Sequence, residues 1–168
     1  RRFNMKLYEA NALKYGSTSA FFGRKIGSKR IIFVIDVSGS MGQNTTCQVG
    51  DNSGLYDKKT GKCYIQCPKL DLAKKELKKC ISGMNSLTKF NILAFSNGVQ
   101  KPFSKMRFAN KGNRKTALKF VDNLMPNGGT DTKSAFQEAF KESEADTVFL
   151  LSDGSPTTGT FSQNNANP

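Results

Sequence analysis

The most constraining feature of the sequence is the apolar run at Arg30–Asp36, which reads RIIFVID. A continuous run of β-branched and aromatic residues is typical of a strand that is buried on both faces, and such strands occur mostly in parallel sheets covered by helices. The runs Lys89–Phe95 (KFNILAF) and Thr147–Leu151 (TVFLL) have the same character. Val99–Phe103 follows a tight-turn sequence and contains a proline, so we expect a short antiparallel edge strand there.

Amphipathic helix patterns separate these runs. Apolar residues recur at helical spacing from Leu70 to Met84 and from Ala117 to Met125, and lysines fill the opposite face of the first pattern. A third helix is expected to start near Asp131, because an acidic side chain stabilises a helix N-terminus. The chain has 168 residues, the size of one domain. The order of elements predicts an α/β fold with an open, doubly wound, mostly parallel sheet flanked by helices.

The composition limits the classes of function. Lysine and arginine number 26 against 13 acidic residues, a net charge of +13, and no acidic residue lies between Leu77 and Val121. Such a field attracts anions, so the surface is either simply solvated or a site for an acidic protein, an anionic polysaccharide or a nucleic acid. The chain has no histidine, which excludes histidine-based general base catalysis and histidine-ligated zinc or haem. The longest apolar run, Ile31–Ile35, is too short to span a bilayer.

A long polar segment at Gln43–Pro68 interrupts the strand–helix rhythm. Loops in α/β units normally have about 2–6 residues, so an ordered loop of this length is expected to be functional or stapled. Disulfides, free buried thiols and a zinc site all remain open, and a disulfide would indicate an oxidising compartment. Asp51–Asp57 is only weakly similar to a calcium loop, because its spacing departs from the EF-hand pattern. The segment holds three of the four cysteines and the next helix pattern holds the fourth: Cys47, Cys63, Cys67 and Cys80.

Oxygen-bearing side chains cluster at the ends of the predicted strands. Asp36, Ser38 and Ser40 form a D-x-S-x-S sequence directly after the first strand, where positions i, i+2 and i+4 of an extended loop point to one side. Thr130 precedes the third helix in a Gly-Gly-Thr-Asp sequence, and Asp153 follows the last strand in a Ser-Asp-Gly sequence. Ligands of open α/β sheets bind beyond the carboxyl ends of the strands. We therefore expect these five side chains to meet there.

Three hydroxyls and two carboxylates are hard ligands, which select Mg²⁺, with Mn²⁺ and Ca²⁺ as the other candidates. Mg²⁺ suits this set because it prefers octahedral geometry and usually keeps several waters. If the two carboxylates act partly through waters, the ion stays under-neutralised and favours a carboxylate from a partner as its last ligand. Each motif is weak alone, and the prediction rests on their joint occurrence in this order.

Four segments, IIFVIDVSGSMG, KFNILAFS, NGGTDT and TVFLLSDGSPTTG, together closely resemble a von Willebrand factor type A domain of the bacterial type. The resemblance extends from Phe21 to Thr160, with 43–68 as an insertion. We assign 30–160 to this domain, 1–29 to an N-terminal extension or linker, and 161–168 to a tail or truncation point.

Members of this family continue after the Ser-Asp-Gly loop with a helix, a strand and a final helix. Ser162–Pro168 shows no apolar periodicity, so we expect the C-terminal strand and helix to be missing. That absence would leave one edge of the sheet unpaired, which native proteins usually avoid. We therefore expect the chain to be part of a longer protein or to be covered by a partner.

The resemblance also implies a metal-ion-dependent adhesion site. Ser38 and Ser40 would bind the metal directly, Thr130 directly or through water, and Asp36 and Asp153 mainly through waters or hydrogen bonds. The implied function is metal-dependent protein binding or adhesion, in which an acidic residue of a partner protein completes the Mg²⁺ shell.

Such a module would be secreted or placed in the cell envelope. The alternative is an intracellular domain in the cytoplasm, assembled with an ATPase or a nucleic acid through its basic surface. An enzyme is not expected, because no serine or cysteine lies beside an evident base.

Overall fold

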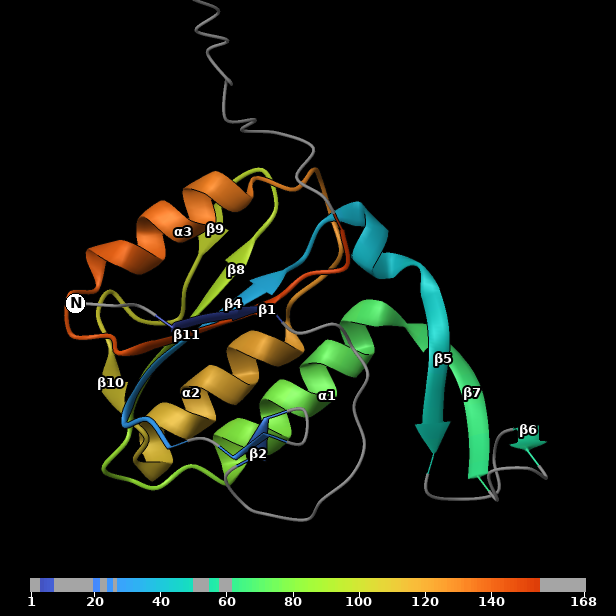
Figure 1. Cartoon of the computed structure of the whole chain (residues 1–168), viewed down its shortest axis with the longest axis horizontal. Helices are drawn as coiled ribbons and strands as arrows, with labels where there is room; N and C mark the ends of the chain where they lie inside the picture. Colours follow the sequence, from blue (N-terminus) through green and yellow to red (C-terminus); the bar gives the residue numbers. More distant parts are fainter. Residues whose placement is uncertain are drawn as a thin grey trace, which may run out of the picture.

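The central sheet of the domain has the architecture that the sequence predicts. In the computed structural model, β4 (Arg30–Asp36) lies between β8 (Lys89–Phe95) and β11 (Thr147–Leu151), and both neighbours pair with it in parallel. The strand order is β1-β11-β4-β8-β10, with β9 paired to β8 (Figure 1). The residues that the structure describes are 4–7, 20–21, 24–25, 27–49, 55–57 and 62–154.

The edge of the sheet beyond β11 carries a strand that the sequence analysis did not predict. β1 (Asn4–Leu7) pairs in parallel with β11, and Asn4 lies opposite Thr147. This is the edge that we expected to be unpaired, and the strand comes from the segment assigned as an extension or linker. Four residues with the sequence NMKL are too few to show a periodicity. A separate antiparallel pair is formed by β2 (Ala20–Phe21) and β3 (Arg24–Lys25).

The opposite edge of the sheet is antiparallel. β9 (Val99–Gln100) pairs with the end of β8, which confirms the expected edge strand in a shorter form. β10 (Arg107–Phe108) pairs with the start of β8 and was not predicted. Both of its residues are exposed, so no apolar pattern marks this strand in the sequence.

Helices cover both faces of the sheet. α1 (Lys69–Ser82) and α2 (Lys111–Asp122) lie side by side on one face, and α3 (Thr132–Lys141) lies on the other (Figure 1). Successive residues of β4 point to opposite faces, so Phe33 packs in the core under α1 and α2 while Val34 packs in the core under α3. Full burial of each such side chain contributes about 1.5–3 kcal/mol to the free energy of unfolding. Within the described residues, no helix is long and apolar enough to cross a membrane.

Side-chain caps fix where two of the helices begin. Asn110 precedes α2, and its Oδ1 accepts a hydrogen bond from the backbone N–H of Asn113 at 2.9 Å. Asp131 precedes α3, as the sequence predicts, and accepts hydrogen bonds from both the backbone N–H and the hydroxyl of Ser134. These bonds favour the ionised form and hold the pKa of Asp131 below its usual value.

The insertion is a three-stranded antiparallel sheet rather than an irregular loop. β5 (Asn44–Val49) pairs with β7 (Lys62–Pro68), and β7 pairs with β6 (Leu55–Asp57). The β5–β7 arms project from the body of the domain (Figure 1). The sequence does contain a short alternation here, with Cys47 and Val49 in one strand and Cys63, Ile65 and Cys67 in the other, but the sequence analysis did not identify it as strands. Residues 51–54 of the weak calcium-loop pattern lie outside the described residues.

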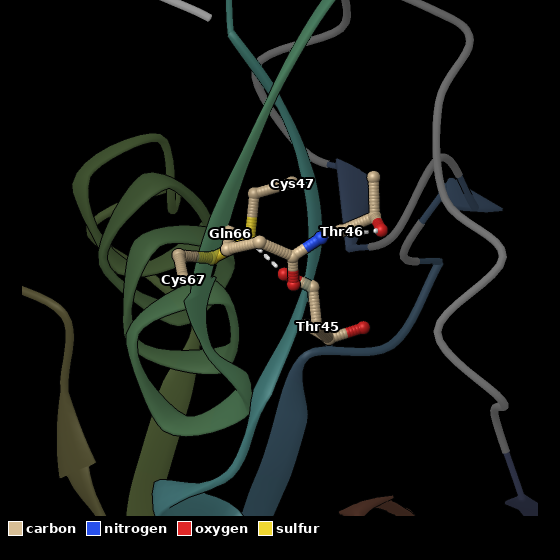
Figure 2. Close-up of a disulfide and its surroundings, with 5 residues drawn as sticks. All are labelled: Thr45, Thr46, Cys47, Gln66 and Cys67. Carbon is tan, nitrogen blue, oxygen red and sulfur yellow. Dashed lines mark hydrogen bonds between the residues drawn. A yellow bond between two sulfur atoms is a disulfide. The ribbon is translucent and has the colours of Figure 1, made fainter. Parts of the chain in front are cut away.

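A disulfide joins Cys47 of β5 to Cys67 of β7, with a Cα–Cα distance of 6.0 Å (Figure 2). This bond confirms that the insertion is stapled. Cys80 is a free, buried cysteine of α1, and burial raises the pKa of its thiol to about 12. Cys63 lies in β7, but its side chain is outside the part of the chain that the structure describes.

Candidate functional site

The site lies at the carboxyl ends of two adjacent strands of the sheet. β4 and β11 run in parallel in a register that places Ile35 opposite Leu151. The residues that follow them therefore leave the sheet side by side. The hydroxyl of Ser152, just after β11, donates a hydrogen bond to Oδ2 of Asp36 at 2.7 Å. This contact ties together two of the loops in which the sequence placed metal ligands.

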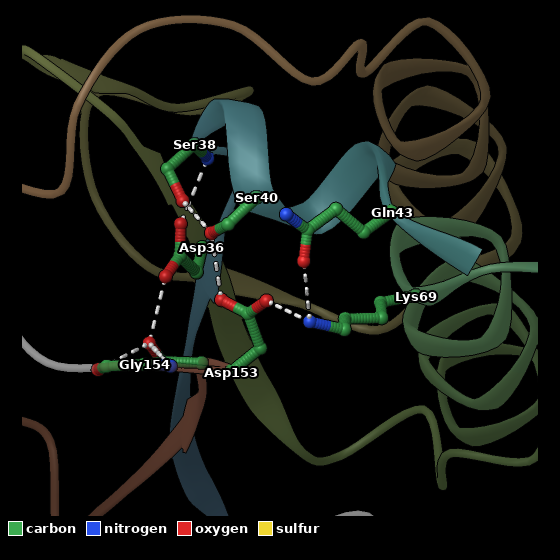
Figure 3. Close-up of polar contacts among 8 residues, drawn as sticks. Asp36, Ser38, Ser40, Gln43, Lys69, Asp153 and Gly154 are labelled. Atoms are coloured by element: carbon green, nitrogen blue, oxygen red, sulfur yellow. Dashed lines mark hydrogen bonds and ion pairs between the residues drawn. The ribbon is translucent and has the colours of Figure 1, made fainter. Parts of the chain in front are cut away.

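The loop after β4 arranges its own hydroxyls. Asp36 is fully buried, and its Oδ1 accepts a hydrogen bond from the backbone N–H of Ser38 at 2.8 Å. The hydroxyl oxygens of Ser38 and Ser40 then lie 3.1 Å apart (Figure 3). Ser40 belongs to the short 3₁₀ helix η1 (Gly39–Gly42), which turns the chain away from the sheet. The hydroxyls of Ser38 and Ser40 therefore lie together next to Asp36, although the loop is a 3₁₀ turn here rather than the extended segment that the sequence analysis assumed.

Asp153 closes the other side of the site. Its Oδ1 accepts a hydrogen bond from the hydroxyl of Ser40 at 2.9 Å (Figure 3). Its Oδ2 accepts one from the ammonium group of Lys69 at 2.7 Å, and the same ammonium group donates to Oε1 of Gln43 at 3.3 Å. The sequence analysis did not identify Lys69 or Gln43, which flank the insertion. The one available signal was a lysine at the start of a helix, where the helix dipole disfavours a positive charge.

A third loop, which contains Thr130, lies at the same end of the strands. The backbone N–H of Gly39 donates to the carbonyl of Gly128 at 2.9 Å, and the N–H of Asn127 donates to the carbonyl of Val37 at 2.8 Å. These two bonds hold the loop before α3 against the loop after β4. Thr130 itself is buried, with 4 % of its surface exposed.

A glycine is required in this third loop. Gly128 has a φ of 76°, a conformation that side chains rarely adopt. A Cβ atom there would lie 2.8 Å from Nδ2 of Asn97. That asparagine side chain also accepts a hydrogen bond from the N–H of Gly129 at 2.7 Å. The close approach therefore fixes the path of the chain immediately before Thr130.

The oxygen atoms of the site have the chemistry and the spacing of ligands for a small octahedral cation. Adjacent ligands about 2.1 Å from Mg²⁺ lie about 3.0 Å from one another. The hydroxyl oxygens of Ser38 and Ser40, 3.1 Å apart, match that separation, and the Asp153 carboxylate beside them accepts a hydrogen bond from the Ser40 hydroxyl. Within the described residues, no group of three or more cysteine, aspartate or glutamate side chains gathers at these loops or anywhere else, so the donor set here is two carboxylates with hydroxyls. The residues present therefore fit Mg²⁺.

Comparison with known proteins agrees with this architecture. Residues 31–155 match the family model of the von Willebrand factor type A domain. A search of curated protein sequences finds no match.

Three solved structures illustrate the likeness of fold. A von Willebrand factor type A protein from Catenulispora acidiphila shares 21% identity over 70% of this chain and 23% of its own, with a TM-score of 0.50. An aerotolerance-related membrane protein from Bacteroides fragilis shares 16% identity over 79% of this chain and 57% of its own, with a TM-score of 0.51. The D319A mutant of the PilB minor pilin from Streptococcus sanguinis shares 20% identity over 79% of this chain and 32% of its own, with a TM-score of 0.50.

The chain spans only part of each of these proteins, from 23% to 57% of their length. At these identities the likeness is one of fold. The family model, in contrast, covers most of the chain and includes all three loops of the site. The chain therefore belongs to the von Willebrand factor type A domain family.

Proposed function

We propose that this domain is a metal-dependent protein-binding module of the bacterial type, with a metal-ion-dependent adhesion site at the three loops. Domains of this family generally mediate protein interactions. The observation that carries the proposal is the 3.1 Å spacing of the Ser38 and Ser40 hydroxyl oxygens, which suits adjacent ligands of Mg²⁺, with the Asp153 carboxylate hydrogen-bonded to Ser40 beside them. A cation bound there supplies an electrophilic position for a carboxylate of the partner.

The side chains divide into direct and indirect ligands. Ser38 and Ser40 would bind the ion directly, and Thr130 directly or through water. Asp36 uses one oxygen to accept the N–H of Ser38 and the other to accept the hydroxyl of Ser152. Both of its oxygens are thus engaged in orienting the loops, which supports an indirect role. Because the direct protein ligands are neutral hydroxyls, the positive charge stays available to an acidic partner.

The basic surface supports an acidic partner as well. α1 starts at the site and packs beside α2, which has no acidic residue before Asp122. A surface of this charge raises the encounter rate of anionic ligands, while the metal would provide the specific contact. The bases exposed on the two helices are Lys75, Lys79, Lys111, Lys115 and Lys119.

The disulfide supports a secreted or cell-envelope location, because such bonds persist in oxidising compartments. The same basic surface favours the second candidate function, an intracellular assembly with a nucleic acid or an ATPase. That candidate predicts reduced cysteines in the native compartment and a steep loss of nucleic-acid binding with salt. We infer a binding role rather than catalysis, since the chain has no histidine to act as a base beside the serines of the site.

The proposal is tested with polyglutamate as the acidic probe. Binding to the wild-type domain is measured in Mg²⁺ and in EDTA at matched ionic strength. We expect a metal-dependent component that the double variant Ser38→Ala/Ser40→Ala loses. The double variant keeps the net charge, so the non-specific electrostatic component stays the same.

Ser104→Ala, an exposed serine outside the site, serves as the matched control and should behave as the wild type does. If the double variant binds polyglutamate as the wild type does, with the same response to EDTA, the proposed function is refuted.

A further inference from the structure

The feature that the family resemblance does not explain is the ammonium group of Lys69 inside the site. It lies 2.7 Å from Oδ2 of Asp153, whose other oxygen accepts the hydroxyl of Ser40 (Figure 3). The Asp153 side chain is only 12% exposed and that of Lys69 is 30% exposed. A positive charge of the protein itself thus neutralises one of the two carboxylates of the site.

Helix α1 gains nothing electrostatically from a lysine at this position. Lys69 is the first residue of α1, and Pro68 before it offers no side-chain cap. The partial positive charge of a helix N-terminus repels a cation. The charge of Lys69 is therefore compensated by Asp153 and by the Gln43 side chain, both of which belong to the site rather than to the helix.

The insertion holds this lysine in place. Asn44 pairs with Pro68 where the β5 and β7 arms leave the domain, and the N–H of Lys69 donates to the carbonyl of Gln43 at 3.0 Å. The disulfide then joins the two arms at Cys67, the residue immediately before Pro68. Gln43 and Lys69, at the two ends of the insertion, thereby lie side by side, and Lys69 contacts Asp153.

We propose that Lys69 sets the cation affinity of the site, as an internal positive charge with which a divalent ion must compete. The inference rests on the proposed function, because it concerns the same site. Without a metal, the ammonium group satisfies Asp153 and keeps the loops assembled. With a metal, two positive charges share one carboxylate and repel each other. Even when largely screened by water, repulsion between a unit and a double charge at contact range weakens cation binding about tenfold or more.

The test compares Mg²⁺ and Mn²⁺ binding to the whole chain by isothermal titration calorimetry. Lys69→Met removes the charge and keeps the length of the side chain, and Lys69→Gln is the second neutral variant in case the first does not fold. Lys69→Arg keeps the charge. Lys101→Met is the matched control, because it removes a similarly exposed lysine whose partner, Glu138, lies away from the site. We expect the neutral variants to bind at least about tenfold more tightly, and the other two within about twofold of the wild type.

The outcomes separate this inference from the proposed function. If Ser38→Ala/Ser40→Ala abolishes binding but the neutral Lys69 variants bind no more tightly than the wild type, the role of Lys69 is overturned and the site stands. If Lys69→Arg binds as tightly as the neutral variants, charge is not the cause and the inference is again overturned. If no variant binds either cation, or if the double serine variant binds as the wild type does, both proposals are overturned.

Discussion

The substitution Gly128→Ala tests the loop geometry that brings Thr130 to the site. Gly128 has a φ of 76°, and a Cβ atom there would lie 2.8 Å from Nδ2 of Asn97. The methyl group therefore meets two obstacles, one in its own backbone and one in a neighbouring side chain.

The two costs can be estimated separately. The left-handed backbone conformation costs a residue with a side chain about 1–2 kcal/mol. The Asn97 side chain is exposed and can move away, but it then loses the hydrogen bond that it accepts from the N–H of Gly129, worth about 0.5–1.5 kcal/mol. Together the two terms lower the free energy of unfolding by about 1.5–3.5 kcal/mol.

The assay is urea denaturation, followed by circular dichroism, of five proteins: the wild type, Gly128→Ala, Asn97→Ala, the Asn97→Ala/Gly128→Ala double variant and Gly98→Ala. In an Asn97→Ala background, Gly128→Ala should cost only the backbone term of about 1–2 kcal/mol, because the steric conflict is already gone. Gly98→Ala is the control, since its Cβ atom would meet nothing within 4 Å and its stability should be unchanged or raised by up to about 1 kcal/mol. A Gly128→Ala protein as stable as Gly98→Ala would refute the loop geometry described here.

Three further predictions concern other parts of the chain. Replacing both Cys47 and Cys67 by serine should lower the free energy of unfolding by about 3 kcal/mol, the chain-entropy value for a sequence separation of 20, as measured by urea denaturation. Hydrogen bonds from Lys101 and then Lys141 lower the pKa of Glu138 from 4.5 to about 2. Because the pKa is lower in the folded state, this stabilisation is complete above about pH 4.5 and is lost as the pH falls toward 2. In urea denaturation across that pH range, Glu138→Gln should remove a pH-dependent contribution of about 1 kcal/mol or less to the free energy of unfolding. The Cys80 thiol, with its pKa raised to about 12, should resist iodoacetamide at pH 8 in the native domain and react in urea, as counted by mass spectrometry.

The sequence predicts the central sheet because the relevant signals are local. Burial on both faces imposes continuous apolar runs on β4, β8 and β11, and the helices between them show apolar residues at helical spacing. Three of the five candidate ligands, Asp36, Ser38 and Ser40, lie within five residues of one another, so their convergence depends on a single loop.

The elements that the sequence analysis missed are defined by their pairing rather than by their own residues. β1 and β10 have four and two residues and gain strand structure only from the neighbour to which they bond. The β5 and β7 strands show only a short alternation of cysteine, valine and isoleucine among polar residues, which the sequence analysis did not distinguish from a polar loop. Lys69 is 84 residues from Asp153 in sequence, so no local pattern relates the two.

Crystals of the domain grown with saturating Mn²⁺ provide the most direct measurement of the central claim, since the anomalous scattering of the ion marks its position without assumption. We expect an anomalous peak at coordination distance from the hydroxyl oxygens of both Ser38 and Ser40, on the side that faces Asp153. A map with no peak at these loops, or with Mn²⁺ bound only elsewhere on the domain, would contradict it.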